Sequence, residues 1–132
     1  MSVVDASVLV DALIVDGPVG VAAREVLAAE PVVDAPAIIR AEAISALRRL
    51  EATGRLSRSN ALAALDELSR LNIRTYLVSP FIDRIWQLRS TLSVYDAWYV
   101  SLAEALGTEL LTTDARLAGA SGPRCSIDIV GP

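Results

Sequence analysis

The sequence predicts an α/β protein, specifically a three-layer α/β/α sandwich with a central, mostly parallel sheet. Short apolar runs that suit buried strands alternate with longer stretches of helical periodicity along the 132 residues. Hydrophobic residues make up 53% of the chain and aromatic residues only 5%, which favours aliphatic helices packed on a sheet. The length is typical of one domain, so we expect residues 1–132 to form a single unit.

The first half of the chain predicts two strands and three helices. They are expected at 2–5 and 31–34 for strands, and at 7–14, 19–29 and 37–52 for helices. Ser7 can cap the first helix, and Pro18 suits the first position of the second. Pro36 is expected to start the third helix, and Gly54 to end it in the left-handed conformation.

The second half predicts four helices and three strands. The helices are expected at 57–71, 80–91, 95–106 and 114–120, and the strands at 73–78, 109–112 and 127–130. The apolar face of the first of these helices is expected to hold Ala61, Leu62, Leu65 and Leu68. Pro80 restarts a helix after the strand, and Gly107 ends the 95–106 helix. Residues 119–123 are expected to form a loose loop.

Missing residue types exclude several kinds of chemistry. The chain has no His, one cysteine (Cys125), and 12 basic residues that are all Arg. This excludes histidine-based triads, multi-cysteine or imidazole zinc sites, lysine Schiff bases and the lysine of a phosphate-binding Walker loop. An enzyme built from this chain must therefore work with carboxylates, hydroxyls, backbone groups and a bound cofactor.

Net charge and hydropathy bear on location and partners. The net charge of −4 argues against a protein that holds nucleic acid through a generally basic surface. An enzyme that acts on nucleic acid with a bound metal ion stays possible, because cations at clustered carboxylates would neutralise them. No apolar run approaches the length of a membrane span, and no signal peptide is recognisable, so we expect a cytoplasmic protein without membrane contact.

Two acids are expected at the carboxyl ends of strands. Asp5 ends the first strand, and Asp114 follows the run Leu110-Leu111-Thr112-Thr113. In open parallel sheets, the crevice beyond the carboxyl ends is the usual ligand site. The alternative for each is that its carboxylate only caps the helix that follows.

Two further acids are expected to face inward from helices. Glu42 lies on or beside the apolar stripe of its helix, among small residues, where an ion without a partner would be costly. A salt bridge to an Arg is the alternative. Asp96 lies in the first turn of the 95–106 helix and shares a face with Tyr99 and Ala103. Its alternative is favourable interaction with the helix dipole.

The four acids together predict a metal site. Four carboxylates that converge on one crevice would repel one another, and a divalent cation with oxygen ligands would neutralise them. Mg²⁺ or Mn²⁺ is favoured, since the residues for a zinc site are missing. Such a site without a phosphate-binding glycine loop points to hydrolysis of a phosphodiester by an activated water.

Four segments resemble the PIN-domain ribonucleases, particularly the VapC-like toxins of toxin-antitoxin systems. The match covers essentially the whole chain. The segments are residues 3–7 (VVDAS), 40–42 (RAE), 95–103 (YDAWYVSLA) and 111–117 (LTTDARL). The order of the four segments is also the family's.

The resemblance implies a PIN-like sandwich, Mg²⁺ or Mn²⁺ at the acids, and endonucleolytic cleavage of RNA. Asp5 and Asp96 would be the principal metal ligands, and Glu42 and Asp114 would complete the catalytic pocket. Hydrogen bonds from Ser7 and Thr112 would support it. Some members carry another acid where this chain has Arg116, which puts a firmly bound second metal ion in doubt.

The resemblance further implies a cognate protein antitoxin and a tRNA, rRNA or mRNA substrate. We expect the antitoxin to insert a basic side chain among the four acids, and to dock an amphipathic helix in apolar grooves of helices at 19–29 and 37–71. A homodimer formed through the same surfaces is also expected. The alternatives are a housekeeping RNA-processing nuclease and a catalytically silent interaction module of the same fold. An aspartyl phosphotransfer domain using Asp5 is disfavoured, because the chain has no lysine and no second Asp two residues on.

Overall fold

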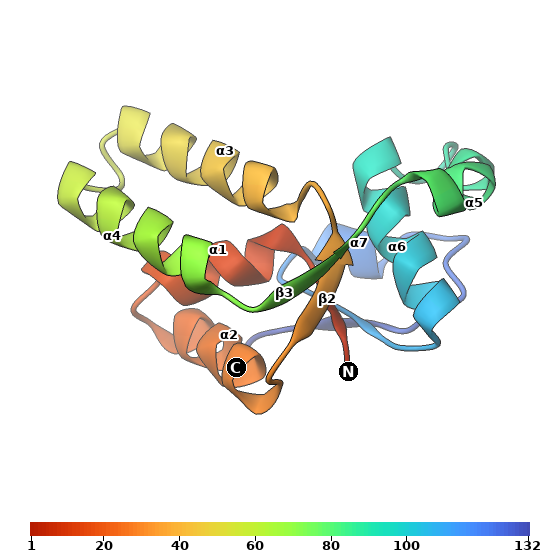
Figure 1. Cartoon of the computed structure of the whole chain (residues 1–132), viewed down its shortest axis with the longest axis horizontal. Coiled ribbons are helices and arrows are strands. Elements are labelled where there is room, and N and C mark those ends of the chain that lie inside the picture. Colours follow the sequence, from red (N-terminus) through yellow and green to blue (C-terminus); the bar gives the residue numbers. More distant parts are fainter.

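The computed structural model describes all 132 residues and shows a five-stranded sheet covered by helices (Figure 1). The strands are β1 (Val3–Val4), β2 (Val33–Pro36), β3 (Ile73–Tyr76), β4 (Leu110–Thr112) and β5 (Ile127–Ile129). The α-helices are α1 (Ala6–Ile14), α2 (Pro18–Ala29), α3 (Ile39–Ala52), α4 (Arg58–Arg70), α5 (Ile82–Gln87), α6 (Val94–Leu106) and α7 (Ala115–Ala118). A short 3₁₀ helix, η1 (Ser79–Phe81), precedes α5.

All strand pairs are parallel, and the strand order is β3-β2-β1-β4-β5. The chain builds outward from β1 to β2 and β3, then returns to place β4 on the other side of β1. Helices α1 to α4 lie on one side of the sheet, and α5 and α6 on the other (Figure 1). The predicted three-layer α/β/α sandwich with a parallel sheet is therefore confirmed. The direction in which successive strands are added to the sheet reverses between β1 and β4. Open parallel sheets form ligand crevices at such a point.

The core surrounds β1 and α6. Val3 and Val4 are fully buried, as expected for a central strand covered on both faces. Every residue from Ala97 to Ala103 in α6 is also buried. A helix buried on nearly all sides holds its side chains in fixed positions, so Asp96 at its first turn is borne on a rigid element.

Two helix ends agree with the predicted glycines, and one predicted cap is wrong. Gly54 and Gly107 have φ values of 76° and 64°, in the left-handed region that favours glycine. Ser7 does not cap α1, because the helix starts at Ala6 and places Ser7 in its first turn. The hydroxyl of Ser7 is used instead for contacts outside the helix, described below.

Two other predicted element boundaries and one predicted apolar face also differ from the structure. Pro36 ends β2 instead of starting α3, because its segment pairs with β3 along its whole length. The expected helix at 80–91 is only the η1 turn followed by the short α5, which ends at Gln87. Leu62 is 58% exposed, whereas Ala64 is buried, so the apolar face of α4 is turned from the predicted one. The packing of α4 against α1 and α3 sets this rotation.

None of the helices alone has the length and apolarity to cross a bilayer. Helices α1 and α2 reach that threshold only when taken together, and a bend of 115° separates them.

Candidate active site

Adjacent strands bring Asp5 and Asp114 to one edge of the sheet. Asp5 follows β1 directly, and Asp114 lies two residues beyond the end of β4. Since β1 and β4 are paired in parallel, their carboxyl ends lie side by side. The two carboxylates are close enough for the charge of Asp114 to raise the pKa of Asp5.

The carboxylate of Asp5 is held by two hydroxyl groups and does not cap α1. Its Oδ2 accepts hydrogen bonds from Thr112 Oγ1 at 2.8 Å and from Ser7 Oγ at 3.1 Å. The Asp5 side chain forms no capping hydrogen bond with α1. The alternative that Asp5 only caps the following helix is therefore wrong. Burial raises the pKa of Asp5, and the bonds from Thr112 and Ser7 counteract part of that rise.

The same two hydroxyls also fix the backbone that follows β4. The N–H of Thr113 donates to Ser7 Oγ at 3.1 Å, and the N–H of Asp114 donates to Thr112 Oγ1 at 3.0 Å. Thr112 is fully buried. The hydroxyls of Ser7 and Thr112 therefore link the β1–α1 turn to the β4–α7 turn and set the position of Asp5 relative to Asp114.

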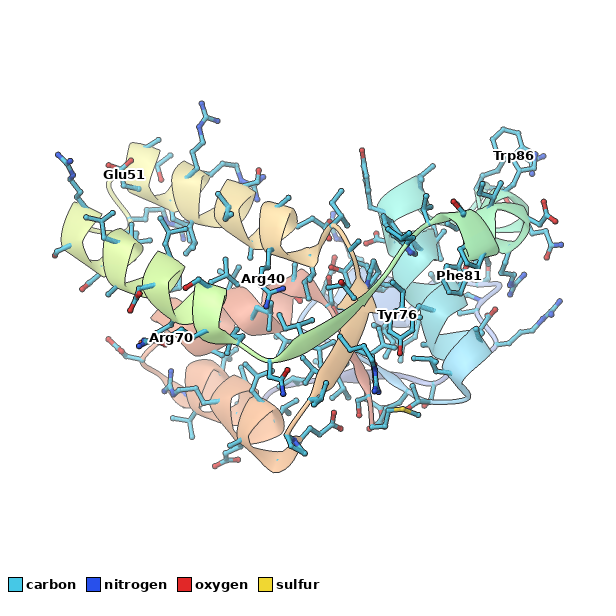
Figure 2. All side chains as sticks on the ribbon, viewed as in Figure 1. Arg40, Glu51, Arg70, Tyr76, Phe81 and Trp86 are labelled. Carbon is cyan, nitrogen blue, oxygen red and sulfur yellow. The ribbon has the colours of Figure 1, made fainter.

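Glu42 reaches the site from the first turn of α3 and is paired with a tyrosine. Tyr99 Oη donates a hydrogen bond of 2.7 Å to Glu42 Oε1. No Arg forms a salt bridge with Glu42, so that alternative is not observed. Arg40, two residues away, points toward α4 (Figure 2) and donates to the carbonyls of Leu68 and Leu71.

The pKa of Glu42 is raised above its usual value. Burial is the main cause, and the charges of Asp5 and Asp96 raise it further, while the Tyr99 bond lowers it. Glu42 is on α3, Asp5 follows β1 and Asp96 is on α6, so three elements bring these carboxyl groups close together. Glu42 thus belongs to the same electrostatic cluster as the strand-end acids.

Asp96 lies in the first turn of α6, which Ser93 caps. The N–H of Asp96 donates to Ser93 Oγ at 3.1 Å. Burial raises the pKa of Asp96, as do the nearby charges of Asp5 and Asp114, whereas Arg116 lowers it. Its place in the first turn is one that the helix dipole favours, and the effects of Asp5 and Asp114 on its pKa show that its carboxylate also lies near these acids.

Asp114 caps α7, which was the alternative to a role in the site, and its carboxylate also lies near the other acids. Its Oδ1 accepts from the N–H of Arg116 at 3.0 Å, at the start of the four-residue α7. The Nε of Arg116 is 3.4 Å from the same oxygen, but the Arg116 side chain is 93% exposed. This solvated ion pair is the only salt bridge formed by any of the four acids.

The structure thus brings together all four acids predicted from the sequence. They share one electrostatic environment, and burial or mutual repulsion raises the pKa of three of them, namely Asp5, Glu42 and Asp96. No group of three or more such side chains is already arranged as a set of metal ligands. The donor chemistry still fits Mg²⁺ or Mn²⁺, because hard oxygen ligands with uncompensated charge attract these ions.

The roles of two side chains at the site, Tyr99 and Ser93, were not predicted from the sequence. The sequence places Tyr99 on the helical face of Asp96, but its bond to Glu42 joins residues far apart in the sequence. Ser93 could have been found, because a Ser three residues before an acid at the start of an apolar helical run is a capping signal. Both residues act by orienting a carboxylate or the helix that bears it.

The fold and site define an α/β protein with a carboxylate cluster at the switch point of a parallel sheet. The family model for the PIN domain matches residues 2–122. The chain therefore belongs to the PIN-domain family, which confirms the resemblance recognised in its sequence motifs.

Curated relatives from Mycobacterium tuberculosis match about half of the chain. Ribonuclease VapC1 is 51% identical over 69 residues, which are 52% of this chain and 52% of that protein. Ribonuclease VapC9 is 45% identical over 67 residues, 51% of this chain and 53% of the relative. Ribonuclease VapC12 is 47% identical over 60 residues, 46% of each. The chain thus spans about half the length of the curated relatives it matches.

Two solved structures share the fold over most of the chain. Mycobacterium tuberculosis VapC20, described as a toxin that cleaves the sarcin-ricin loop, gives a TM-score of 0.69 at 18% identity, covering 90% of this chain and 94% of its own. The PAE2754 protein of Pyrobaculum aerophilum gives a TM-score of 0.71 at 21% identity, covering 97% and 83%. At these identities the likeness shows a common fold.

Proposed function

We propose that this chain is a metal-dependent endoribonuclease that hydrolyses RNA phosphodiester bonds, and that it is the toxin of a toxin-antitoxin pair. The observation that carries the proposal is the convergence of Asp5, Glu42, Asp96 and Asp114 at the carboxyl edge of the sheet, with one solvated Arg as their only cationic partner. The names of the VapC relatives support ribonuclease activity. We take residues 1–132 as one nuclease domain.

The roles of the side chains follow from their contacts. Asp5 and Asp96 would be the main ligands of Mg²⁺ or Mn²⁺, with Glu42 and Asp114 completing the pocket. A bound divalent cation would stabilise charge on the reacting phosphate and lower the pKa of a water molecule. Ser7 and Thr112 orient Asp5, and Tyr99 orients Glu42, so these hydroxyls hold the acids in position.

The partners follow from the same charge distribution. An antitoxin could place an Arg among the carboxylates, since a guanidinium pairs with carboxylates through two hydrogen bonds. The groove of about 230 Å³ between α3 and α4, which includes the exposed side chains of Ile44 and Leu62, supports docking of an amphipathic helix there. Because the proposed substrate is cellular tRNA, rRNA or mRNA, we place the enzyme in the cytoplasm.

A homodimer is also part of the proposal, but exposed apolar side chains favour a surface on α5 over the helices at 19–29 and 37–71 expected from the sequence. Trp86 is 63% exposed and projects from the body of the protein (Figure 2). It lies on α5 near exposed Ile82, and large apolar side chains of this kind favour association between chains. Sedimentation equilibrium of the wild type and of Trp86→Ala tests this. A monomeric wild type would contradict it.

The activity is tested with purified protein and total RNA that contains both tRNA and rRNA. Internal cleavage is expected with Mg²⁺ or Mn²⁺, and none with excess chelator. Undiminished cleavage in chelator, or cleavage only from the RNA ends, would overturn the proposal.

The antitoxin mechanism is tested by titrating a cognate antitoxin at several Mg²⁺ concentrations, because an inserted Arg must compete with the metal ion. Inhibition that is independent of metal concentration would contradict that mechanism.

A further inference from the structure

A groove of about 420 Å³ runs from the candidate active site along the side of α3 that faces α1. The two helices lie next to each other on one side of the sheet (Figure 1). The groove is lined by Ala6, Ser7, Val10 and Asp11 of α1 and by Glu42, Ser45, Ala46 and Arg49 of α3. Ser7 and Glu42 also belong to the candidate active site, so the groove opens directly onto the carboxylate cluster.

The four lining positions of α3 form one stripe along that helix. Glu42, Ser45, Ala46 and Arg49 follow the spacing i, i+3, i+4, i+7, which puts all of them on one face. The small side chains of Ser45 and Ala46 leave the middle of the groove open. Seven residues of helix separate Glu42 from Arg49 by about 10.5 Å along the helix axis. The stripe thus starts with a carboxylate of the site and ends with a cation.

Arg49 has no partner within the protein. Its side chain is exposed and forms no salt bridge and no side-chain hydrogen bond, although Asp11 lines the same groove. By contrast, Arg40 on the same helix is engaged with backbone carbonyls of α4. The guanidinium of Arg49 is therefore free to bind an anion from solution.

We propose that this groove holds the nucleotide of the RNA next to the scissile bond, and that Arg49 binds its phosphate. The proposal rests on the ribonuclease function proposed above. The groove volume suits a group of nucleotide size. A guanidinium can pair with two phosphate oxygens at once, which makes Arg a good phosphate ligand. Asp11 lines the same groove and would repel a phosphate, whereas Arg49 would attract one, so we place the phosphate at Arg49.

Arg49 would also resolve an electrostatic difficulty. A cluster of carboxylates repels the polyanionic RNA strand, and the chain has a net charge of −4. A free cation about two helical turns from Glu42 provides a local attraction beside the cluster. It would guide one strand of RNA across the acids without a generally basic surface.

Arg48 provides a matched control. It is the next residue of the same helix, it forms no salt bridge, and it lines the other groove, between α3 and α4. Arg48→Gln and Arg49→Gln remove the same charge from adjacent positions. Only Arg49→Gln removes a cation from the groove that opens onto the site.

The experiment measures binding and cleavage separately. Each Arg variant is placed in an Asp5→Asn background, and binding of a short fluorescein-labelled single-stranded RNA of mixed sequence is followed at several salt concentrations. Arg49→Gln is expected to weaken binding roughly tenfold, because it removes a charge-assisted hydrogen bond. It should also reduce the slope of log K against log salt by about 0.7, the value for one phosphate contact on a single strand. Arg48→Gln should leave that slope unchanged.

Cleavage of total RNA separates failure of this inference from failure of the proposed function. With Asp5 intact, Arg49→Gln should raise KM and change kcat little, while thermal unfolding shows that the variant is folded. Equal effects of the two Arg variants on binding, with cleavage retained, would overturn the Arg49 subsite and leave the ribonuclease proposal in place. A wild type that cleaves no RNA with either metal ion would overturn both.

Discussion

The hydroxyl of Tyr99 donates a hydrogen bond of 2.7 Å to the carboxylate of Glu42, and so connects α6 to α3 across the candidate active site. Tyr99 is 1% exposed. Burial raises the pKa of Tyr99, and the negative charge of Glu42 raises it further, so the tyrosine stays a neutral donor at physiological pH. The bond favours the ionised form of Glu42, because a hydrogen bond to the charged form of a carboxyl lowers its pKa.

Tyr99→Phe is therefore expected to shift the pH dependence of cleavage. Burial already raises the pKa of Glu42. If the reaction needs the ionised carboxylate, lowering the pH should therefore abolish activity at a higher pH than for an ordinary Glu. Loss of the Tyr99 bond raises the pKa of Glu42 further, and the acidic limb of the kcat/KM profile should move to still higher pH. Stability should fall by about 1–2 kcal/mol.

The control for this change is Tyr95→Phe, on the same helix with an exposed ring. Profiles of kcat/KM against pH and denaturant unfolding are measured for both variants. If the acidic limb of the Tyr99→Phe profile coincides with that of the wild type, Glu42 is not the group whose ionisation the reaction needs.

Amide substitutions test the acids themselves. Asp5→Asn and Asp96→Asn each remove one charge and almost no volume, so the fold should persist while kcat/KM falls by roughly a hundredfold or more. Glu67→Gln, an exposed acid on α4, is the matched control and should cleave as the wild type does. Circular dichroism verifies the fold of each variant. Wild-type rates in both Asp variants would place the chemistry elsewhere.

Removing metal ions should destabilise the wild type more than the Asp5→Asn variant. A bound cation offsets repulsion among the acids, so chelator should lower the Tm of the wild type. In chelator at neutral pH, Asp5→Asn should be the more stable protein, since it lacks one buried charge.

This advantage should depend on pH in a defined direction. The pKa of Asp5 is raised in the folded state. Its contribution to stability is therefore fully present below the ordinary carboxyl pKa and is lost as pH rises through the raised value. The Tm difference between Asp5→Asn and the metal-free wild type should accordingly grow from low to neutral pH. A constant difference across that range would show that Asp5 does not have a raised pKa.

Thr112→Val tests the hydroxyl that supports two acids. The substitution keeps the shape of the buried side chain but removes the donor to Asp5 Oδ2 and the acceptor of the Asp114 N–H. We expect a loss of about 1–3 kcal/mol in the free energy of unfolding, with reduced cleavage. Thr75→Val, an exposed position on β3 without a side-chain hydrogen bond, is the control. Equal stability of the two variants would mean that the Thr112 bonds contribute nothing net.

The features that could be predicted from the sequence are those set by residues close together in the chain or by the order of strands and helices. The parallel sheet, the glycine ends of α3 and α6, and the placement of Asp5 and Asp114 after strands all depend on neighbouring residues or on the alternation of elements. The partner of Glu42 was not predictable, because Tyr99 lies 57 positions away and the bond exists only once α3 and α6 are packed. The supporting bonds of Ser7 were expected from the family resemblance, whereas its local sequence alone predicted a different use. Its position favours a helix cap, but contacts with β4 outweighed that preference.

The bond from Thr112 to Asp5 joins residues that are 107 positions apart. During synthesis, Asp5 emerges from the ribosome long before β4 can pair with β1 and bring Thr112 and Asp114 beside it. The acids therefore cannot assemble on a nascent chain until β4 has been synthesised and has paired with β1. The proposed cleavage of RNA would therefore be absent from any nascent chain in which β4 has not yet paired with β1.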